Sequence, residues 1–320
     1  MRAMAIERFG GAEQLGTARL PVPETGPGHI LLRNAAAGVG YWDVMAREGR
    51  FGAMEFPYVP GLESAGVVER VGAGVTDFQP GDEVYAFDVP GGGYAELRAV
   101  SADAAARRPE SLSAQEAAGV PVAATTAHQA LVDVLGVERG EAVLVTGAAG
   151  GVGAFAVQIA ARLLGARVVG TASAPDHPAV RESGATAAVD YRDDAWPQAV
   201  RDAAGGGVDA MLDCAGGEVR PQVLLRGFEA VRDGGRAVYI PSLEDEPRPG
   251  TEPVPPRGIR ARFLGAEPDG RLLASLARLF DDGRLRSPRQ QVLPLSDAHR
   301  AHELVASGGT RGRLVLSVDG

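Results

Sequence analysis

The chain has 320 residues, of which 45% are hydrophobic and 23% charged, so it is long enough for about two domains with buried cores. Its formal charge of −9 and the absence of a basic run argue against nucleic acid as a partner. All 32 basic residues are arginines, and the lack of lysine excludes Schiff-base chemistry, a Walker A phosphate site and a Tyr/Lys dehydrogenase dyad.

The cysteine content and the lack of long apolar segments indicate where in the cell the protein is located. A single cysteine, Cys214, cannot form a disulfide within the chain or supply the thiolates of a structural zinc or iron–sulfur site. The first residues carry charges, and no stretch of about 18 apolar residues occurs anywhere. We expect a cytoplasmic protein without a membrane partner.

The first part of the chain has the pattern of a β-rich fold. Up to about residue 107, glycine and proline separate short apolar runs, which is typical of strands and turns. Ser113 stands three residues before Glu116, as in a helix-capping box, and a long apolar-periodic stretch follows it. The sequence therefore predicts that a helix opens a new region here.

The middle of the chain alternates strand and helix patterns. We predict helices over 151–164 and 178–184 among others, and strands over 142–146, 166–172, 187–191, 209–214 and 236–240. Parallel neighbours need a crossover, which the helices provide, so the alternation predicts an α/β fold with a doubly wound parallel sheet.

The last part of the chain follows a proline-rich segment, 244–257, which we predict to be an exposed loop. Beyond it the pattern indicates a helix over 269–282, a strand near 290–295, a helix over 296–307 and a strand over 313–318. We expect this last strand to rejoin the β-rich first part.

A glycine-rich turn lies between the strand at 142–146 and the helix after it. Without a Cβ, Gly150 and its neighbours let backbone N–H groups approach a pyrophosphate at a helix N-terminus, and Gly153 lets the helix pack tightly against the strand. The strand–turn–helix context predicts dinucleotide binding, although Ala148 takes the first glycine position of the strict spacing. The candidate contacts are Gly147, Ala149, Gly150, Gly151, Val152 and Gly153.

The end of the second strand of this unit bears on the choice of cofactor. An NAD site would place Asp or Glu about twenty residues past the turn, but Thr171, Ala172 and Ser173 stand there, which favours NADP. Asp176 lies just beyond and leaves NAD open. The candidate 2′-phosphate ligands are Ser173, His177, Tyr191 and, as the strongest by charge, Arg181, whose alternative is an ordinary solvated helix residue.

Several motifs in order resemble one family. The runs at 57–87, 92–97, 125–131, 146–153 and 213–217 together resemble the medium-chain dehydrogenase/reductase superfamily, in its zinc-independent quinone oxidoreductase (zeta-crystallin-like) branch. The resemblance implies a GroES-like β-rich catalytic domain (1–117), an inserted NADP-binding Rossmann domain (118–265) and a return to the catalytic domain (266–320). It also implies a homodimer, for which the segments 236–240 and 260–266 are the candidate edge strands.

The zinc ligands of this superfamily are largely missing. Gly40 and Leu62 stand where the zinc-dependent members have Cys and His, and only Glu63 is retained. Catalytic zinc needs three protein ligands, so we expect no metal.

The resemblance also implies cofactor contacts outside the glycine turn. Thr126 matches a residue near the nicotinamide, Phe263 a segment that holds the carboxamide, and Arg313 a basic residue that reaches the cofactor. Ile240 and Ser242 follow the fifth strand, at the sheet edge where the nicotinamide half is expected. Ala215, in the motif at 213–217, completes the set for NADP(H).

Without zinc, a nicotinamide hydride can still reduce a quinone or an enone, because the carbonyl oxygen then needs only hydrogen-bond donors. Tyr41 is the candidate that orients the carbonyl or supplies a proton, the alternative being that Tyr41 and Trp42 are walls of an apolar pocket. Asp43 is a second catalytic candidate, with a structural pairing as its alternative. Phe51 and Tyr58 are candidate substrate contacts, and Phe51 lacks the hydroxyl that related enoyl thioester reductases have at that place.

The sequence therefore predicts a zinc-independent NADPH-dependent reductase of quinones or of the C=C bond of α,β-unsaturated carbonyl compounds. Two alternatives stay open: an enoyl reductase dedicated to one biosynthetic, polyketide-type intermediate, and an NADPH-binding protein without physiological turnover.

Overall fold

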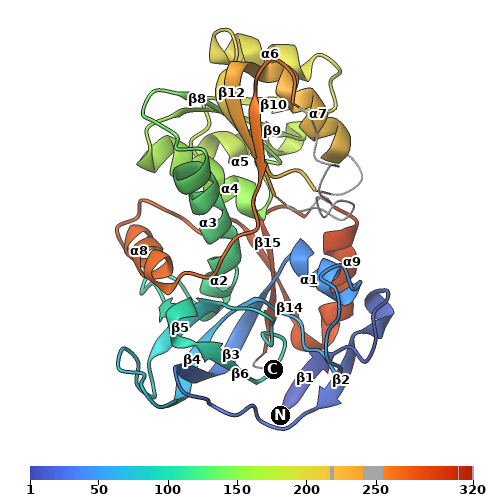
Figure 1. Cartoon of the computed structure of the whole chain (residues 1–320), viewed down its shortest axis with the longest axis vertical. Helices are drawn as coiled ribbons and strands as arrows, with labels where there is room; N and C mark the ends of the chain where they lie inside the picture. Colours follow the sequence, from blue (N-terminus) through green and yellow to red (C-terminus); the bar gives the residue numbers. More distant parts are fainter. Residues whose placement is uncertain (217–219, 241–254, 309, 319–320) are drawn as a thin grey trace. The chain divides into compact units, whose positions relative to one another are not determined.

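The computed structural model describes residues 1–216, 220–240, 255–308 and 310–318 (Figure 1). The chain divides into two compact units, Met1–Thr125 with Glu267–Gly320 (unit 1) and Thr126–Ala266 (unit 2). Ser242 and most of the loop predicted at 244–257 lie outside the described residues.

Unit 1 is built mainly of β-strands. Its strands are β1 (Arg2–Ala5), β2 (Gly16–Arg19), β3 (His29–Val39), β4 (Glu63–Val71), β5 (Glu83–Phe87), β6 (Leu97–Ser101), β7 (Ala105–Arg107), β14 (Gln290–Pro294) and β15 (Arg313–Ser317). Its helices are α1 (Tyr41–Arg47), α2 (Ala114–Ala118), α8 (Gly270–Asp281) and α9 (Ala298–Ala306), and α3 (Pro121–His128) crosses from unit 1 into unit 2.

The main sheet of unit 1 joins the two ends of the sequence. Its strand order is β14-β15-β3-β4-β5-β7, with β6 also paired to β3. The last strand, β15, runs antiparallel to β3 with Leu314 opposite Val39 and Ser317 opposite Ala36. The prediction that the final strand rejoins the first part is confirmed.

The predicted capping box is present at the start of α2. The Glu116 amide donates to the Ser113 hydroxyl at 3.2 Å, and the Ser113 amide donates to the Glu116 carboxylate at 2.9 Å. Two amides that the helix itself leaves without a partner are thereby satisfied, which fixes the beginning of the helix.

A buried ion pair ties β15 to β4 and to the start of α3. Glu63 is fully buried and Arg313 is 5% exposed, and the Arg313 guanidinium contacts one Glu63 oxygen. The other Glu63 oxygen accepts from the Val122 amide at 2.8 Å, while Arg313 Nε donates to the Gly119 carbonyl at 2.9 Å. Because each charge also bonds the backbone, the pair fixes the chain where it enters α3.

Unit 2 is the doubly wound parallel sheet that the strand–helix alternation predicts. Its six strands lie in the order β10-β9-β8-β11-β12-β13, and every pair is parallel. The strands are β8 (Ala142–Thr146), β9 (Arg167–Ala172), β10 (Ala187–Asp190), β11 (Val208–Asp213), β12 (Val231–Tyr239) and β13 (Arg260–Phe263). The helices are α4 (Gly151–Gln158), α5 (His177–Glu182), α6 (Trp196–Ala204) and α7 (Arg220–Ala230), and π-helical turns over 129–134 and 159–163 extend α3 and α4.

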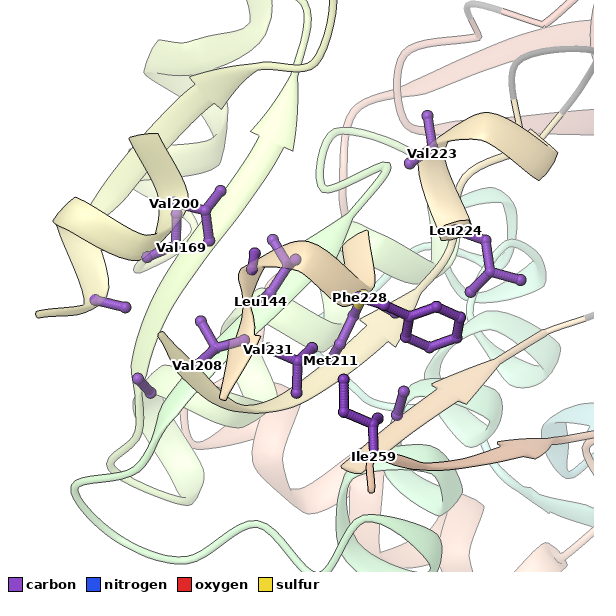
Figure 2. Close-up of a cluster of buried hydrophobic side chains, with 14 of the residues drawn as sticks. Leu144, Val169, Val200, Val208, Met211, Val223, Leu224, Phe228, Val231 and Ile259 are labelled. Carbon is purple, nitrogen blue, oxygen red and sulfur yellow. The ribbon is translucent and has the colours of Figure 1, made fainter. Parts of the chain in front are cut away.

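One hydrophobic cluster of unit 2 lies between this sheet and two of its helices. Figure 2 shows Leu144, Val169 and Met211 from the strands packed with Val200 of α6 and Phe228 of α7. Burying such side chains stabilises the unit by about 1.5–3 kcal/mol each. This packing fixes the helices against the sheet, and the loops at the carboxyl ends of its strands are anchored to it.

No helix in the described parts of the chain combines the length and the hydropathy that a transmembrane span requires.

Candidate functional site

The glycine turn joins β8 to α4 and contains two glycines that packing requires. Gly147 has φ +59°, and a methyl group there would lie 2.7 Å from the Cys214 carbonyl oxygen. A methyl group on Gly153 would lie 2.2 Å from the Gly147 carbonyl oxygen. Both positions therefore exclude any side chain, at Gly147 because the turn passes close to the end of β11, and at Gly153 because α4 passes close to the turn.

Gly150 has a different environment. Its φ of −79° suits any residue, and a methyl group there would meet a single atom within 4 Å, the Gly147 carbonyl oxygen at 3.2 Å. A methyl group here would need the Gly147 carbonyl to shift by a few tenths of an ångström, and the rest of the space beside Gly150 is open. The first amides of α4 lie next to this space, and such amides have no acceptor within their own helix. An open, amide-lined turn at the positive end of a helix fits a pyrophosphate.

Thr146 and Asp213 connect the ends of β8 and β11 beside this turn. The Thr146 hydroxyl donates to the Asp213 carboxylate and accepts from the Cys214 amide at 3.2 Å, and the Ala215 amide donates to the same carboxylate at 3.3 Å. The predicted contact Ala215 is thereby held close to Gly147, where an added methyl group would lie 3.1 Å from the Ala215 nitrogen. Burial raises the pKa of the Cys214 thiol well above its usual range, so this thiol stays protonated.

The ends of β9 and β10 form a second polar cluster, since Asp190 lies opposite Ala172 in the parallel register. The Ser173 hydroxyl donates to the Asp176 carboxylate. Asp190 accepts two bonds from the Arg192 guanidinium, at 3.0 and 2.8 Å, and one from the Ala174 amide at 3.2 Å. These bonds, those from Arg192 above all, hold the pKa of Asp190 well below its usual range.

The other predicted 2′-phosphate ligands differ in availability. Arg181 on α5 is exposed, and no ion pair holds it within the described residues. His177 Nε2 lies 3.2 Å from the Ala172 carbonyl oxygen, and Tyr191 packs against the core of unit 2. Sequence reasoning missed Asp190 and Arg192, although an acid ending a strand two residues before an arginine was a signal for them.

The substrate candidates of unit 1 begin with the first turn of α1. Tyr41 and Trp42 are half-buried, and Arg313 lies over the Trp42 ring with its guanidinium carbon 5.3 Å from the ring centre. A methyl group on Gly40 would lie 2.1 Å from the Trp42 ring. The Trp42 ring therefore occupies the space that a side chain at position 40 would need.

Asp43 is fully buried and bonded to backbone on both oxygens. Oδ2 accepts from the Gly40 amide at 2.9 Å, and Oδ1 accepts from the Gly61 and Leu62 amides at 3.0 and 3.3 Å. Burial raises the pKa of Asp43 to about 6, against the opposing effect of these bonds. The carboxylate thus connects the turn at 61–62 to the start of α1, and its catalytic role stays a prediction.

The other two substrate candidates of unit 1 differ in exposure. Phe51 is 45% exposed in the segment after α1, whereas Tyr58 is buried and its hydroxyl donates to the Pro90 carbonyl at 2.6 Å. Burial also raises the pKa of Tyr58. The chain itself holds the Tyr58 hydroxyl proton, so this proton is not available to a ligand while the bond to Pro90 lasts.

The remaining cofactor candidates differ in their burial and in their contacts. Thr126 is buried in α3, and the half-buried Ile240 donates its amide to the Asp213 carbonyl at 3.3 Å. Phe263 is 37% exposed on β13 and packs edge to face with Tyr239. Arg313, predicted to reach the cofactor, has its guanidinium bonded to Glu63 and Gly119 as described above.

The donor groups do not fit a zinc ion. Among the described residues, no group of three His, Cys, Asp or Glu side chains is placed to hold a metal. Glu63, the one superfamily zinc-motif residue retained, is engaged by Arg313 and the Val122 amide. Glycine at 40 and leucine at 62 add no donor side chains.

Two family models match the chain. Residues 26–110 match a model described as "Alcohol dehydrogenase GroES-like domain", and residues 183–316 match one described as "Zinc-binding dehydrogenase".

Curated relatives extend the similarity to nearly the whole sequence. The quinone oxidoreductase of Sus scrofa is 31% identical over 328 residues, which cover 99% of this chain and 97% of that protein. The human synaptic vesicle membrane protein VAT-1 homolog is 34% identical over 241 residues, or 74% of this chain, and the match spans 60% of that relative's length.

Solved structures share the fold over nearly the whole length of the chain. An NAD-dependent alcohol dehydrogenase superposes with a TM-score of 0.89 at 33% identity, covering 99% of this chain and 100% of the other. The Escherichia coli quinone oxidoreductase in complex with NADPH gives a TM-score of 0.88 at 26% identity, again covering 99% and 100%. Both the fold class predicted from the sequence and the superfamily resemblance are confirmed.

The two kinds of glycine in the turn predict opposite mutational effects. Gly150→Asp places a carboxylate in the open space and lowers NADPH affinity by about 100-fold or more through repulsion of the pyrophosphate. The free energy of unfolding changes by less than about 1 kcal/mol, because aspartate is a favoured residue at a helix N-cap. Calorimetric titration and urea unfolding measure the two quantities.

Gly153→Ala is the matched control. Its methyl group forces α4 away from the turn and lowers the free energy of unfolding by about 1–3 kcal/mol. Full NADPH affinity in Gly150→Asp would refute the assignment of the turn as the pyrophosphate site.

Asp43 predicts a pH-dependent stability. Its pKa rises from 3.8 to about 6 on folding, so it stabilises the fold most below about pH 4 and loses that contribution as the pH rises through about 6. The stability of the wild type relative to Asp43→Asn therefore falls across this window. Urea unfolding at several pH values measures the difference in the free energy of unfolding between the two proteins. A difference that does not vary with pH would contradict the raised pKa of Asp43.

Proposed function

This chain belongs to the medium-chain dehydrogenase/reductase superfamily, and from that membership we propose that it is a zinc-independent, NADPH-dependent reductase of quinones or of the C=C bond of α,β-unsaturated carbonyl compounds. Its similarity to quinone oxidoreductases over nearly the full length makes it an oxidoreductase of the medium-chain type. The substrate class, the independence from zinc and the choice of NADPH are the proposed refinements.

The glycine turn is the observation that carries the proposal. Gly153 lets α4 pack against the turn after β8, Gly147 lets that turn pack against the end of β11, and Gly150 leaves the outer side of the turn open. In the proposed complex, the first amides of α4 bind the pyrophosphate and the Ala215 backbone lines the adjacent end of β11. Thr126, Ile240, Ser242 and Phe263 are the proposed contacts of the nicotinamide half.

NADPH rather than NADH is proposed on the charges that follow β9. The strand ends at Ala172 without an acid, and the exposed Arg181 supplies a cation for a 2′-phosphate. The quinone oxidoreductase of Escherichia coli was solved with NADPH, while the similar alcohol dehydrogenase is described as NAD-dependent. The preference therefore rests on this chain's own residues.

Independence from zinc is proposed on the donor groups. The Trp42 ring fills the place of a side chain at position 40, and Glu63 is committed to Arg313. Because the described residues offer no donor set for a Lewis acid, polarisation of a carbonyl falls to hydrogen-bond donors, which suffices for quinones and enones.

The proposed chemistry divides between the cofactor and the chain. Bound NADPH supplies a hydride to the β-carbon of an enone or to a quinone. Tyr41 at the start of α1 orients the substrate carbonyl and holds a proton on its hydroxyl. Trp42, Phe51 and Tyr58 form apolar walls, and the Asp43 carboxylate fixes the start of α1 by accepting the Gly40 amide.

Self-association and location complete the proposal. Among the described strands β13 is the last of the six in its sheet, and Phe263 on it is 37% exposed. A sheet edge with unpaired backbone groups is suited to pairing with a second copy, and we propose a cytoplasmic homodimer with small-molecule substrates.

Loss of NADPH absorbance against a panel of quinones and enones, with and without a chelator, tests the proposal. We expect chelator-resistant turnover that is faster with NADPH than with NADH. Turnover abolished by chelation would refute zinc independence. Tight NADPH binding without turnover of any compound would favour a dedicated biosynthetic enoyl substrate or a binding protein without turnover, and would contradict the broad reductase.

Tyr41→Phe distinguishes proton donation from a wall role, with Phe51→Leu as a comparison that keeps the apolar wall. We expect kcat for enones to fall about 100-fold in Tyr41→Phe, in the range for loss of a general acid. An unchanged kcat would leave Tyr41 as a wall residue.

A further inference from the structure

The proton of the Ser173 hydroxyl is committed to a carboxylate. Ser173 is the first residue after β9, the place where a dinucleotide site meets the adenosine ribose. Its hydroxyl donates to Asp176, three residues further along the chain. A serine hydroxyl has one hydrogen, so while this bond holds, Ser173 presents only lone pairs to any other group.

The charges around Ser173 are not equally available to a ligand. Asp190 accepts hydrogen bonds from two nitrogens of the Arg192 guanidinium and from the Ala174 amide. The charges of Asp190 and Arg192 therefore largely cancel each other. Asp176 is half-buried beside Ser173, and its charge also contributes to raising the pKa of Arg192, behind the larger effect of Asp190. Arg181 is the exposed cation on the helix that follows.

We propose that Asp176 is a specificity-determining residue for the cofactor, which binds the 2′-hydroxyl of NADH through Ser173 and opposes the 2′-phosphate of NADPH. This inference rests on the proposed dinucleotide function and deepens it: the preference for NADPH is a balance of Arg181 against Asp176.

The two cofactors differ in the hydrogen bonds they can make at this place. A ribose 2′-hydroxyl can donate to the lone pairs of Ser173 while the serine proton stays on Asp176. The anionic oxygens of a 2′-phosphate only accept hydrogen bonds. They would therefore face a Ser173 hydroxyl whose proton is already donated, and also the negative charge of Asp176. Breaking the Ser173–Asp176 bond frees the serine proton for the phosphate, and neutralising the acid removes the negative charge.

Asp176→Asn is the central test, measured by calorimetric titration with NADP⁺ and NAD⁺. We expect NADP⁺ affinity to rise about tenfold while NAD⁺ affinity does not rise, because the variant removes one negative charge at the 2′-position. The variant is expected to fold, because Asp176 makes no side-chain cap to α5.

Glu182→Gln is the matched control, since it removes the same charge from an exposed position at the other end of α5. We expect it to change neither affinity by more than about twofold, because solvent screens exposed charges. Equal effects of the two variants would show a general charge effect and overturn the proposal.

Ser173→Ala supplies an independent readout that involves no change in charge. We expect NAD⁺ affinity to fall about threefold to tenfold through loss of one hydrogen bond, with NADP⁺ affinity nearly unchanged. Loss of NADP⁺ affinity in this variant would mean that Ser173 donates to the phosphate and would overturn the proposal. Failure of the wild-type protein to bind either nucleotide would instead refute the proposed function itself.

Discussion

The close approach of α4 to the end of β8 is the constraint on which the nucleotide unit depends. Gly153 lies so near the Gly147 carbonyl that not even a methyl group fits between them. This contact brings the amide end of α4 over the edge of the sheet, and the Thr146–Asp213 bond holds the neighbouring strand ends level with it. The turn is thus closely packed at Gly147 and Gly153 and open at Gly150.

Unit 1 relies on buried charges that bond backbone. Asp43 accepts three amides, and Glu63 and Arg313 bond each other as well as Val122 and Gly119. Buried charges are costly unless paired and hydrogen-bonded, so such groups specify one arrangement of the chain more than they add stability. Here that arrangement sets the Trp42 ring under Arg313, in the place of a metal-ligating side chain at position 40.

Local pattern predicted most elements of the fold, but it did not predict α1 within the β-rich part or the side-chain partnerships between elements. The strand over 142–146, the Ser113–Glu116 capping box and the return of the last strand follow from periodicity and turn chemistry. The Glu63–Arg313 pair joins residues 250 positions apart, and no local signal encodes it. Likewise β12 begins at Val231, ahead of the predicted 236, because its first residues pair with β11 across a register shift. Asp190 and Arg192 lie beside Ser173, at the proposed binding place of the adenosine ribose, only because β9 and β10 pair in parallel.

The central claim is that a dinucleotide pyrophosphate binds the amides of the glycine turn. Hydrogen–deuterium exchange with and without saturating NADPH tests it directly, because an amide bound to phosphate exchanges more slowly. The account predicts slower exchange in peptides that cover 147–154, and little change in peptides that cover β2 (Gly16–Arg19), which contains no proposed cofactor contact. Saturated NADPH binding with unchanged exchange at 147–154 would contradict it.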